Sequence, residues 1–167
     1  MGFWGAANEP PLAQTDAGGD DARRMGQAMH RWLEGLSAHG PTEPVEPQAL
    51  AQAFGLNHAQ LQEVQHRVNA IRSGPAAWVW RQDRVQQEAN EVDVYTASGW
   101  GRIDRLIWDV HQRCWWVLDY KSAHRPEQNE ASRNQVRGYM AAVQTWFAHQ
   151  TVRGALIGGN GSWSEVD

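Results

Sequence analysis

The feature that most constrains this chain is a change in the spacing of its apolar residues at Glu91. Before this point apolar residues recur at helical spacing, whereas residues 91–96 alternate between apolar and polar side chains. Residues 101–108 and 115–121 are two further strand-like segments, and only short turn-like stretches separate the three. This pattern predicts an antiparallel meander within an α/β fold, in which helices flank a small mixed central sheet.

Further elements are expected on both sides of the meander. Asn57 is a suitable N-cap, and Gly74-Pro75 ends the helix that follows it. Residues 76–90 are ambiguous and form either a short helix or an irregular path toward the sheet. The other expected elements are helices over 21–39, 48–54, 57–72 and 131–149, and strands over 151–157 and 162–166.

The length of 167 residues suits one domain with a sizeable core. We expect residues 1–20 to be a linker or disordered N-terminus, and residues 21–167 to form the domain. Within it, residues 21–75 would be a helical part and residues 76–167 the sheet core that carries the site. The chain has no signal peptide pattern and no apolar run long enough for a membrane span, so we expect a cytoplasmic protein without membrane association.

The composition limits the chemistry that the chain can support. The single cysteine, Cys114, excludes an internal disulfide framework and a cysteine-ligated iron–sulfur cluster. The net charge of −4 argues against a broad surface that coats nucleic acid. It leaves room for a small patch that faces phosphates, or for an acidic metal site.

Lys121 is the only lysine in the chain, while the other fourteen basic residues are arginines. It follows the apolar run 115–118 and is separated from Asp119 by Tyr120. A lysine amine is a compact charge that can meet a small anion or a water, whereas a guanidinium is a broad fork. The position of Lys121, the only lysine, near an acid at the end of an apolar run indicates either a functional amine or a residue that caps the end of a buried strand.

The hairpin register places this lysine near two acids. If Trp108 lies opposite Trp115, then Asp104 lies opposite Asp119, and strand alternation puts Lys121 on the same face as both. Two opposed carboxylates repel each other and need a compensating positive charge.

Several groups could supply that charge. Lys121 and Arg102 are the basic candidates in the protein, and a divalent cation such as Mg²⁺ or Mn²⁺ is the other. Glu91, on the neighbouring strand, could add a further carboxylate. The alternative is a hairpin with ordinary surface acids.

The sequence Gly101-Arg-Ile-Asp104-Arg-Leu, followed by Asp119-Tyr-Lys121, resembles the PD-(D/E)XK nuclease superfamily. Two more motifs resemble the RecB-type nuclease domain at the C-terminus of UvrD/AddA-like helicase–nucleases. They are Gly26-Gln-Ala-Met-His30-Arg-Trp-Leu-Glu34 and Gln135-Val-Arg-Gly-Tyr139. The four motifs occur in the order of that family, and the resemblance runs from about residue 22 to the end of the chain.

The resemblance implies a restriction-endonuclease-like core and a set of site residues. Lys121 would be the catalytic lysine, with Asp119, Asp104 and Glu91 as the catalytic acids. Glu88 is an alternative to Glu91. The metal, Mg²⁺ or Mn²⁺, would be bound by His30, Asp104, Asp119 and the backbone carbonyl of Tyr120.

Residues after the catalytic strand would contact DNA. Gln135 and Tyr139 share one helix face and would point at the site or at the DNA backbone. Arg125, Arg133 and Arg137 could meet phosphates in a sequence-independent way, or simply form a solvated face. Trp108, Trp115 and Trp116 are expected in the core, whereas Trp100 at a turn is a candidate for base stacking.

The function implied is an exonuclease-type, Mg²⁺-dependent deoxyribonuclease of DNA repair or recombination, acting on single- or double-stranded ends. The chain has no phosphate-loop motif and therefore no helicase motor of its own. We expect it to be the C-terminal part of a helicase–nuclease, with the motor in the same polypeptide or in a partner subunit; the other option is a small separate nuclease. Two alternatives remain: a catalytically silent DNA-binding or scaffold domain of a repair complex, and an interaction module with no role on nucleic acid.

Overall fold

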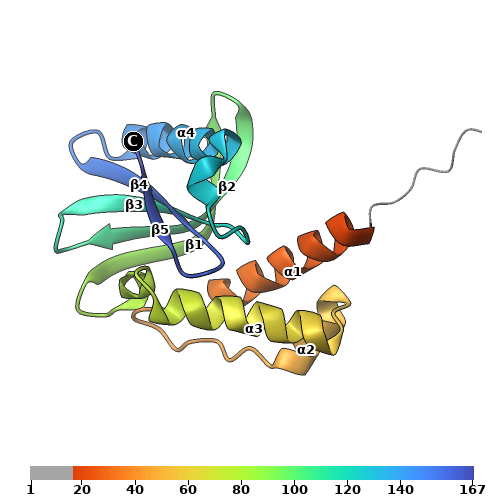
Figure 1. Cartoon of the computed structure of the whole chain (residues 1–167). Coiled ribbons are helices and arrows are strands. Elements are labelled where there is room, and N and C mark those ends of the chain that lie inside the picture. The colour runs from red at the N-terminus through yellow and green to blue at the C-terminus, as the bar shows by residue number, and fades with distance from the viewer. Residues whose placement is uncertain (1–16) are drawn as a thin grey trace, which may run out of the picture.

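A five-stranded mixed sheet in the order β1-β2-β3-β4-β5 lies at the centre of the computed structural model, which describes residues 17–167 (Figure 1). Strands β3 and β4 run parallel, and the other three neighbouring pairs run antiparallel. This arrangement confirms the predicted α/β class. The strands are β1 (Val85–Thr96), β2 (Gly99–Asp109), β3 (Cys114–Tyr120), β4 (Thr151–Ile157) and β5 (Trp163–Val166).

Helices cover both faces of the sheet. α1 (Ala17–Glu34), α2 (Pro47–Phe54) and α3 (His58–Ser73) lie on one side, and α4 (Glu130–Trp146) lies on the other (Figure 1). Helix α4 connects β3 to β4, because parallel neighbours need a crossover that is long enough to reverse the chain. The short 3₁₀ helices η1 (Ala77–Trp80) and η2 (Pro126–Gln128) precede β1 and α4. None of the helices within residues 17–167 combines the length and the apolar character that a bilayer crossing requires.

Several predicted boundaries need correction. The first helix was expected over residues 21–39, but it runs from Ala17 to Glu34. It ends early because the following segment contacts the sheet: the Ser37 hydroxyl and the Ala38 N–H both donate to the Glu88 carboxylate. Residues 17–20, predicted as linker, therefore belong to α1, and residues 1–16 lie outside the described part of the chain. Strand β1 begins at Val85, within the segment that the sequence left ambiguous, and not at Glu91.

The second and third helices match their predictions closely. Asn57 caps α3 through its side chain, which accepts a hydrogen bond from Gln60 N at 2.9 Å. The Gln60 side chain reciprocates by accepting from Asn57 N at 2.9 Å, which completes a capping box.

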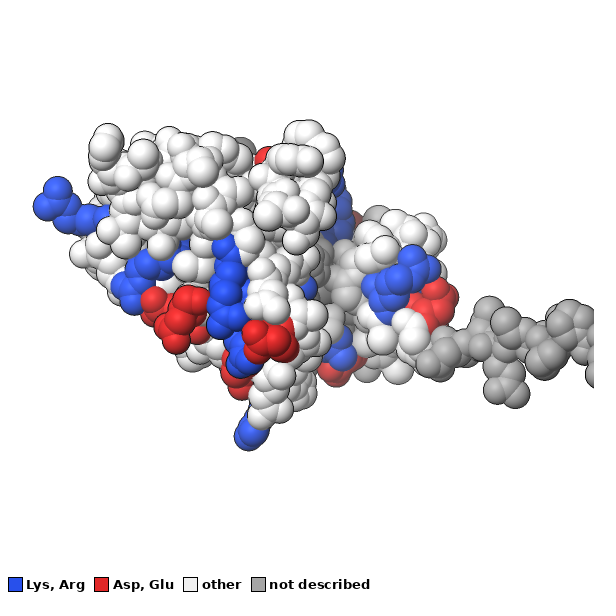
Figure 2. Space-filling view, turned by 90° about the horizontal axis from the view of Figure 1, so that it is seen from above, with Lys and Arg blue, Asp and Glu red and all other residues white. Residues whose placement is uncertain are grey.

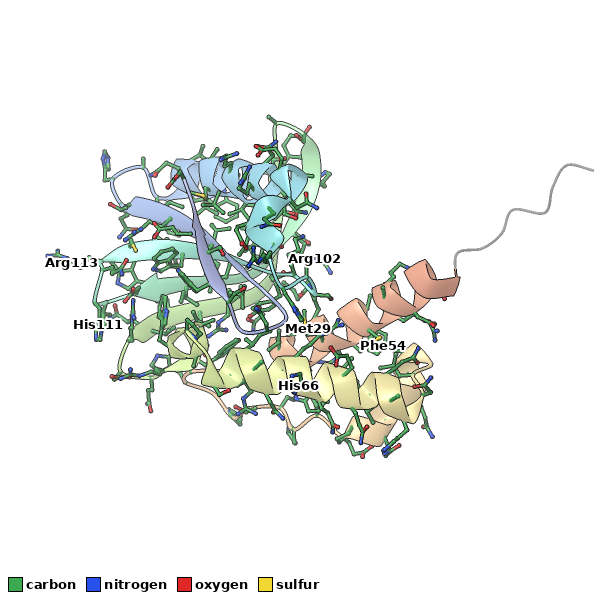
Figure 3. All side chains as sticks on the ribbon, in the orientation of Figure 1. Met29, Phe54, His66, Arg102, His111 and Arg113 are labelled. Atoms are coloured by element: carbon green, nitrogen blue, oxygen red, sulfur yellow. The ribbon has the colours of Figure 1, made fainter. Side chains whose placement is uncertain are left out.

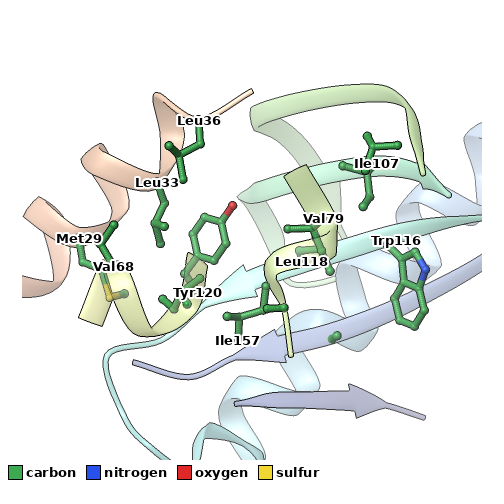
Figure 4. Close-up of a cluster of buried hydrophobic side chains, with 14 of the residues drawn as sticks. Met29, Leu33, Leu36, Val68, Val79, Ile107, Trp116, Leu118, Tyr120 and Ile157 are labelled. Atoms are coloured by element: carbon green, nitrogen blue, oxygen red, sulfur yellow. The ribbon is translucent and has the colours of Figure 1, made fainter. Parts of the chain in front are cut away.

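Alternation along β3 divides the core into two layers. Trp116, Leu118 and Tyr120 pack with the α1–α3 side, where the Tyr120 ring lies close to Leu33 of α1 (Figure 4). Trp115 and Val117 pack on the other face against α4. Trp115 and Trp116 are buried, as predicted. Each helical layer is thus held to the sheet by apolar burial, the dominant favourable term in folding.

An ion pair between Glu88 of β1 and Arg105 of β2 joins the two strands, and the Glu88 carboxylate also anchors the segment after α1 by accepting from Ser37 Oγ and Ala38 N. Arg105 of β2 is fully buried and donates to Glu88 Oε2 at 2.6 Å, to Asn90 Oδ1 at 2.9 Å and to the Val79 carbonyl at 2.8 Å. Burial alone would raise the pKa of Glu88, but hydrogen bonds from Ser37 and Ala38 and the charge of Arg105 outweigh it. They lower the pKa of Glu88 to about 2.

Replacing Glu88 with glutamine is therefore expected to lower the free energy of unfolding at pH 7 by about 3 kcal/mol, because it leaves the buried guanidinium unpaired. The carboxylate stabilises the fold fully above its ordinary pKa of 4.5, and this contribution disappears as the pH falls toward 2. The difference between Glu88→Gln and the wild-type protein should accordingly shrink between pH 5 and pH 3 in urea titrations.

Glu63→Gln is the matched control, because Glu63 pairs with Arg67 on the outside of α3 at 2.9 Å. It should cost less than about 0.5 kcal/mol at either pH. Equal effects of the two substitutions would contradict a structural role for the buried pair.

Candidate active site

The two acids of the predicted site meet at one end of β2 and β3. Pairing of Trp108 with Trp115 confirms the predicted register, and the antiparallel ladder extends to the pair of Arg105 and Leu118. Asp104 and Asp119 are the next residues, and both are buried. Burial and the negative charge of Asp104 raise the pKa of Asp119, so the ionised pair is unfavourable in this position.

Two groups of β3 and its extension offset this repulsion. The Tyr120 N–H donates to Asp104 Oδ2 at 2.7 Å. The Lys121 amine lies 2.9 Å from Asp119 Oδ2. Arg102, the other basic candidate, instead pairs with Asp93 at 2.9 Å and approaches Glu91 at 3.6 Å. Lys121 therefore supplies the positive charge nearest to the acid pair.

Helix α1 brings His30 to the same point. Its Nδ1 lies 3.3 Å from Asp104 Oδ1, and its Nε2 lies 2.9 Å from the Tyr120 carbonyl, to which it can donate. Burial opposes the charged form of the ring, but the hydrogen bond and charge of Asp104 outweigh it and raise the pKa of His30. Gly26 permits this approach of α1, since a Cβ there would lie 3.1 Å from Ser122 Oγ, next to Lys121.

Glu91 occupies an irregular point in the sheet. The β1–β2 ladder pairs Asn90 with Arg105 and Val92 with Ile103, but it skips Glu91 and Asp104 between them. Glu91 adopts a left-handed φ of 52°, which is uncommon for a residue with a side chain. Such strain is typical of positions where the fold directs a side chain toward a functional site.

The Glu91 carboxylate faces a cleft of about 330 Å³ that His30 also lines. Burial and the negative charges of Asp104 and Glu34 raise the pKa of Glu91. Glu88, the alternative to Glu91, is occupied by Arg105 and by the backbone after α1. Of the two glutamates, Glu91 is the one that the structure brings to the acid pair.

Helix α4 closes the other side of the site. Lys121 Nζ donates to Gln135 Oε1 at 3.0 Å, and Gln135 Nε2 donates to the Tyr139 hydroxyl at 3.0 Å. The predicted common face of Gln135 and Tyr139 is thereby confirmed. Gly101 makes room for the Tyr139 ring, because a Cβ at Gly101 would lie 2.6 Å from a ring carbon.

The predicted phosphate-binding arginines differ in their environments. Arg133 pairs with Glu130 and donates to the Glu127 carbonyl at 2.7 Å, and Arg137 pairs with Glu130 at 3.1 Å. Arg125 is exposed before η2 and pairs with no carboxylate among residues 17–167. In the face seen in Figure 2, basic side chains (blue) and acidic side chains (red) are interspersed beside a broad uncharged area. Of the three arginines, Arg125 is the most available for a phosphate, because the other two are paired with Glu130.

Residues of the His30 cleft to which the sequence assigned no role include Gln27 and Glu34, although both lie within the quoted Gly26–Glu34 motif. They line the cleft together with His30, Glu91, Arg31 and Phe54. Gln27 precedes His30 by three residues and Glu34 follows it by four, so all three share one face of α1. The helical spacing around His30 was the signal that could have identified them.

No three His, Cys, Asp or Glu side chains within residues 17–167 are already grouped closely enough to hold a metal ion. The donor set nevertheless suits Mg²⁺ or Mn²⁺, because it combines two carboxylates, a carbonyl and an imidazole. Asp119 Oδ2 is buried, and the Lys121 amine at 2.9 Å is its close partner. A divalent cation would therefore share this oxygen with the amine or replace it there.

The strain at Glu91 leads to a prediction about stability. Glu91→Gly is expected to raise the free energy of unfolding by about 1 kcal/mol in EDTA at pH 7, because glycine accepts a left-handed φ without steric cost. It also removes a carboxylate that Asp104 and Glu34 repel. Because the folded state raises the pKa of Glu91, the repulsive part should be present at pH 7 and absent at pH 4.

Arg113→Gly is the matched control, since Arg113 also has a left-handed φ, of 55°, in the β2–β3 turn. Arg113 lies at the opposite end of the sheet from Arg102 (Figure 3). Its substitution should relieve strain equally at both pH values in urea unfolding. A Glu91→Gly protein that is less stable than the wild type would refute the account of Glu91.

Comparison with known protein families places this arrangement in context. The family model of the PD-(D/E)XK nuclease superfamily matches residues 7–160. No curated protein sequence gives a significant match to the chain.

Proposed function

The chain belongs to the PD-(D/E)XK nuclease superfamily, and we propose that it is a metal-dependent deoxyribonuclease. The observation that carries this proposal is the buried pair of Asp104 and Asp119, with the only lysine of the chain 2.9 Å from Asp119. An acid pair that needs a cation, beside an amine that can meet an anion, suits hydrolysis of a phosphodiester.

Asp104, Asp119, His30 and the Tyr120 carbonyl would hold the metal, with Mg²⁺ favoured and Mn²⁺ possible by donor type. When bound, such a metal polarises a phosphoryl oxygen and makes a bound water more acidic. To act as a ligand, the His30 ring must be neutral and exchange its contact with Asp104 for the metal. Protonation of His30 should therefore compete with metal binding.

Lys121 would orient the attacking water or stabilise the negative charge that develops on the phosphoryl group. Its hydrogen bond to Gln135 holds the amine in place from the α4 side. The water oxygen forms a new bond to phosphorus, the bond from phosphorus to the leaving sugar oxygen breaks, and that oxygen takes up a proton. Glu91 lies near enough to influence the charge of the site and would act as an additional acid or base.

The finer assignments rest on the motifs. The Gly26-x-x-x-His30 and Gln135-x-x-x-Tyr139 patterns support a RecB-type exonuclease that acts on DNA ends in repair or recombination. A helicase motor in the same polypeptide or in a partner subunit would deliver those ends. Gln135, Tyr139 and Arg125 would contact the DNA backbone, and Arg133 and Arg137 would contribute only after exchanging their pairing with Glu130.

A catalytically silent DNA-binding or scaffold domain is the second candidate. The observation that favours it is that no metal-binding triad is preassembled among the described residues. The two candidates differ in their response to added metal, because only the nuclease would cut DNA.

The assay is cleavage of end-labelled linear DNA and of a covalently closed single-stranded circle. With Mg²⁺, the wild-type protein should degrade the linear strands and spare the circle, and EDTA should abolish the activity. Lys121→Ala should lower kcat by about 10²–10³-fold, because it removes a charge positioned for the transition state. Arg113→Gly, at the far end of the sheet, should leave cleavage unchanged.

Three results would count against the nuclease. Activity that persists in EDTA would exclude the metal, and full activity of Lys121→Ala would exclude the role of the amine. DNA binding by a well-folded wild-type protein without any metal-dependent cleavage would favour the silent domain.

A further inference from the structure

Two aromatic side chains stand exposed at the tip of the β1–β2 hairpin. Trp100 is 77% exposed and Tyr95 is 66% exposed. The two residues are direct cross-strand partners, and their rings meet edge to face with centroids 5.1 Å apart. The two rings form a small exposed apolar patch, and such patches can mark a binding site.

The hairpin tip lies beside the N-terminal part of α4 (Figure 1). Residues of these two elements line a cleft of about 390 Å³. The cleft is lined by Thr96, Ser98, Trp100, Asn134 and other residues of these two elements. None of the described residues that line it carries a charge. The cleft therefore offers an aromatic face and uncharged hydrogen-bonding groups, which suit a neutral ring with polar edges better than a phosphate.

The cleft shares two lining residues with the candidate active site. Gln135 and Tyr139 line it, and the same two residues form the hydrogen-bonded chain that reaches Lys121. A strand whose phosphate lies at Lys121 would therefore have a neighbouring nucleotide beside the cleft.

We infer that Trp100 and this cleft bind an unpaired base of single-stranded DNA, next to the phosphate that is cut. The inference rests on the proposed nuclease function and names its substrate class. A base can stack on an exposed indole only if its faces are free, and in a duplex both faces are covered by neighbouring bases. Asn134, Ser98 and Thr96 can hydrogen-bond base edges from the walls of the cleft.

The test measures binding in EDTA by fluorescence anisotropy, so that no cleavage occurs. The probes are fluorescein-labelled oligothymidylate and an abasic oligonucleotide of equal length, which carries the same phosphates without bases. Trp100→Ala should weaken binding of oligothymidylate about tenfold, as expected for the loss of one stacking contact, and should leave binding of the abasic strand unchanged. Trp100→Phe should restore most of the affinity, because a phenyl ring still stacks.

Trp146→Ala is the matched control, since Trp146 is 47% exposed at the end of α4 and does not line the cleft. It should bind both probes like the wild-type protein. If Trp100→Ala also binds oligothymidylate like the wild type, the hairpin tip serves another occupant, such as a protein segment, and the inference is overturned. The same holds if both probes are weakened equally, or if the wild-type protein binds no oligothymidylate at low salt.

The outcome is separable from that of the nuclease assay. Base-dependent binding through Trp100 together with no cleavage in Mg²⁺ would refute the nuclease and retain the stacking site. Cleavage in Mg²⁺ by a protein whose DNA binding does not depend on Trp100 would support the nuclease and refute the stacking site.

Discussion

The repulsion between the carboxylates of Asp104 and Asp119 is the constraint on which the candidate site depends. Strand register places the two acids side by side at the end of the β2–β3 ladder, where burial strengthens their interaction. Three neighbouring contacts offset part of this negative charge: the Tyr120 N–H on Asp104, the Lys121 amine on Asp119, and the imidazole of His30 against Asp104. The carboxylate of Glu91 adds to the repulsion. A bound cation would reduce the repulsion between the two carboxylates, so the site favours cation binding.

The rest of the fold delivers these groups from different layers. Helix α1 carries His30 from one side of the sheet, and Gly26 lets the helix approach the segment after Lys121. Helix α4 carries Gln135 from the other side, while the irregularity at Glu91 interrupts the β1–β2 ladder beside Asp104. The site therefore lies where two separately packed cores meet, so its geometry depends on the apolar burial that holds each helix to the sheet.

The sequence predicts those parts of this arrangement that follow from local periodicity. Alternation in the β2–β3 hairpin places Asp104 next to Asp119 once Trp108 is assumed to lie opposite Trp115, and the structure confirms that pairing. The Asn57 cap follows from residue type. The early start of β1 was hidden, because its Gln86, Gln87, Glu88 and Asn90 do not alternate with apolar residues, and a distant partner, Arg105, stabilises it. Local pattern contains no sign of the left-handed φ of Glu91. The pairing of Arg133 and Arg137 with Glu130, by contrast, lies within α4 at helical spacing, so the sequence carries a signal for it.

The most direct test of the central claim is the free energy of unfolding of the wild-type and Asp119→Asn proteins at pH 8, measured in EDTA and in MgCl₂. Because the fold raises the pKa of Asp119, its ionised form destabilises the metal-free protein, and Asp119→Asn should be the more stable of the two in EDTA. Mg²⁺ should stabilise only the wild type, by about 2.7 kcal/mol at one hundred times the dissociation constant, and so move the difference between the two proteins toward the wild type by that amount. A wild-type protein that is more stable than Asp119→Asn in EDTA and does not respond to Mg²⁺ would contradict the account.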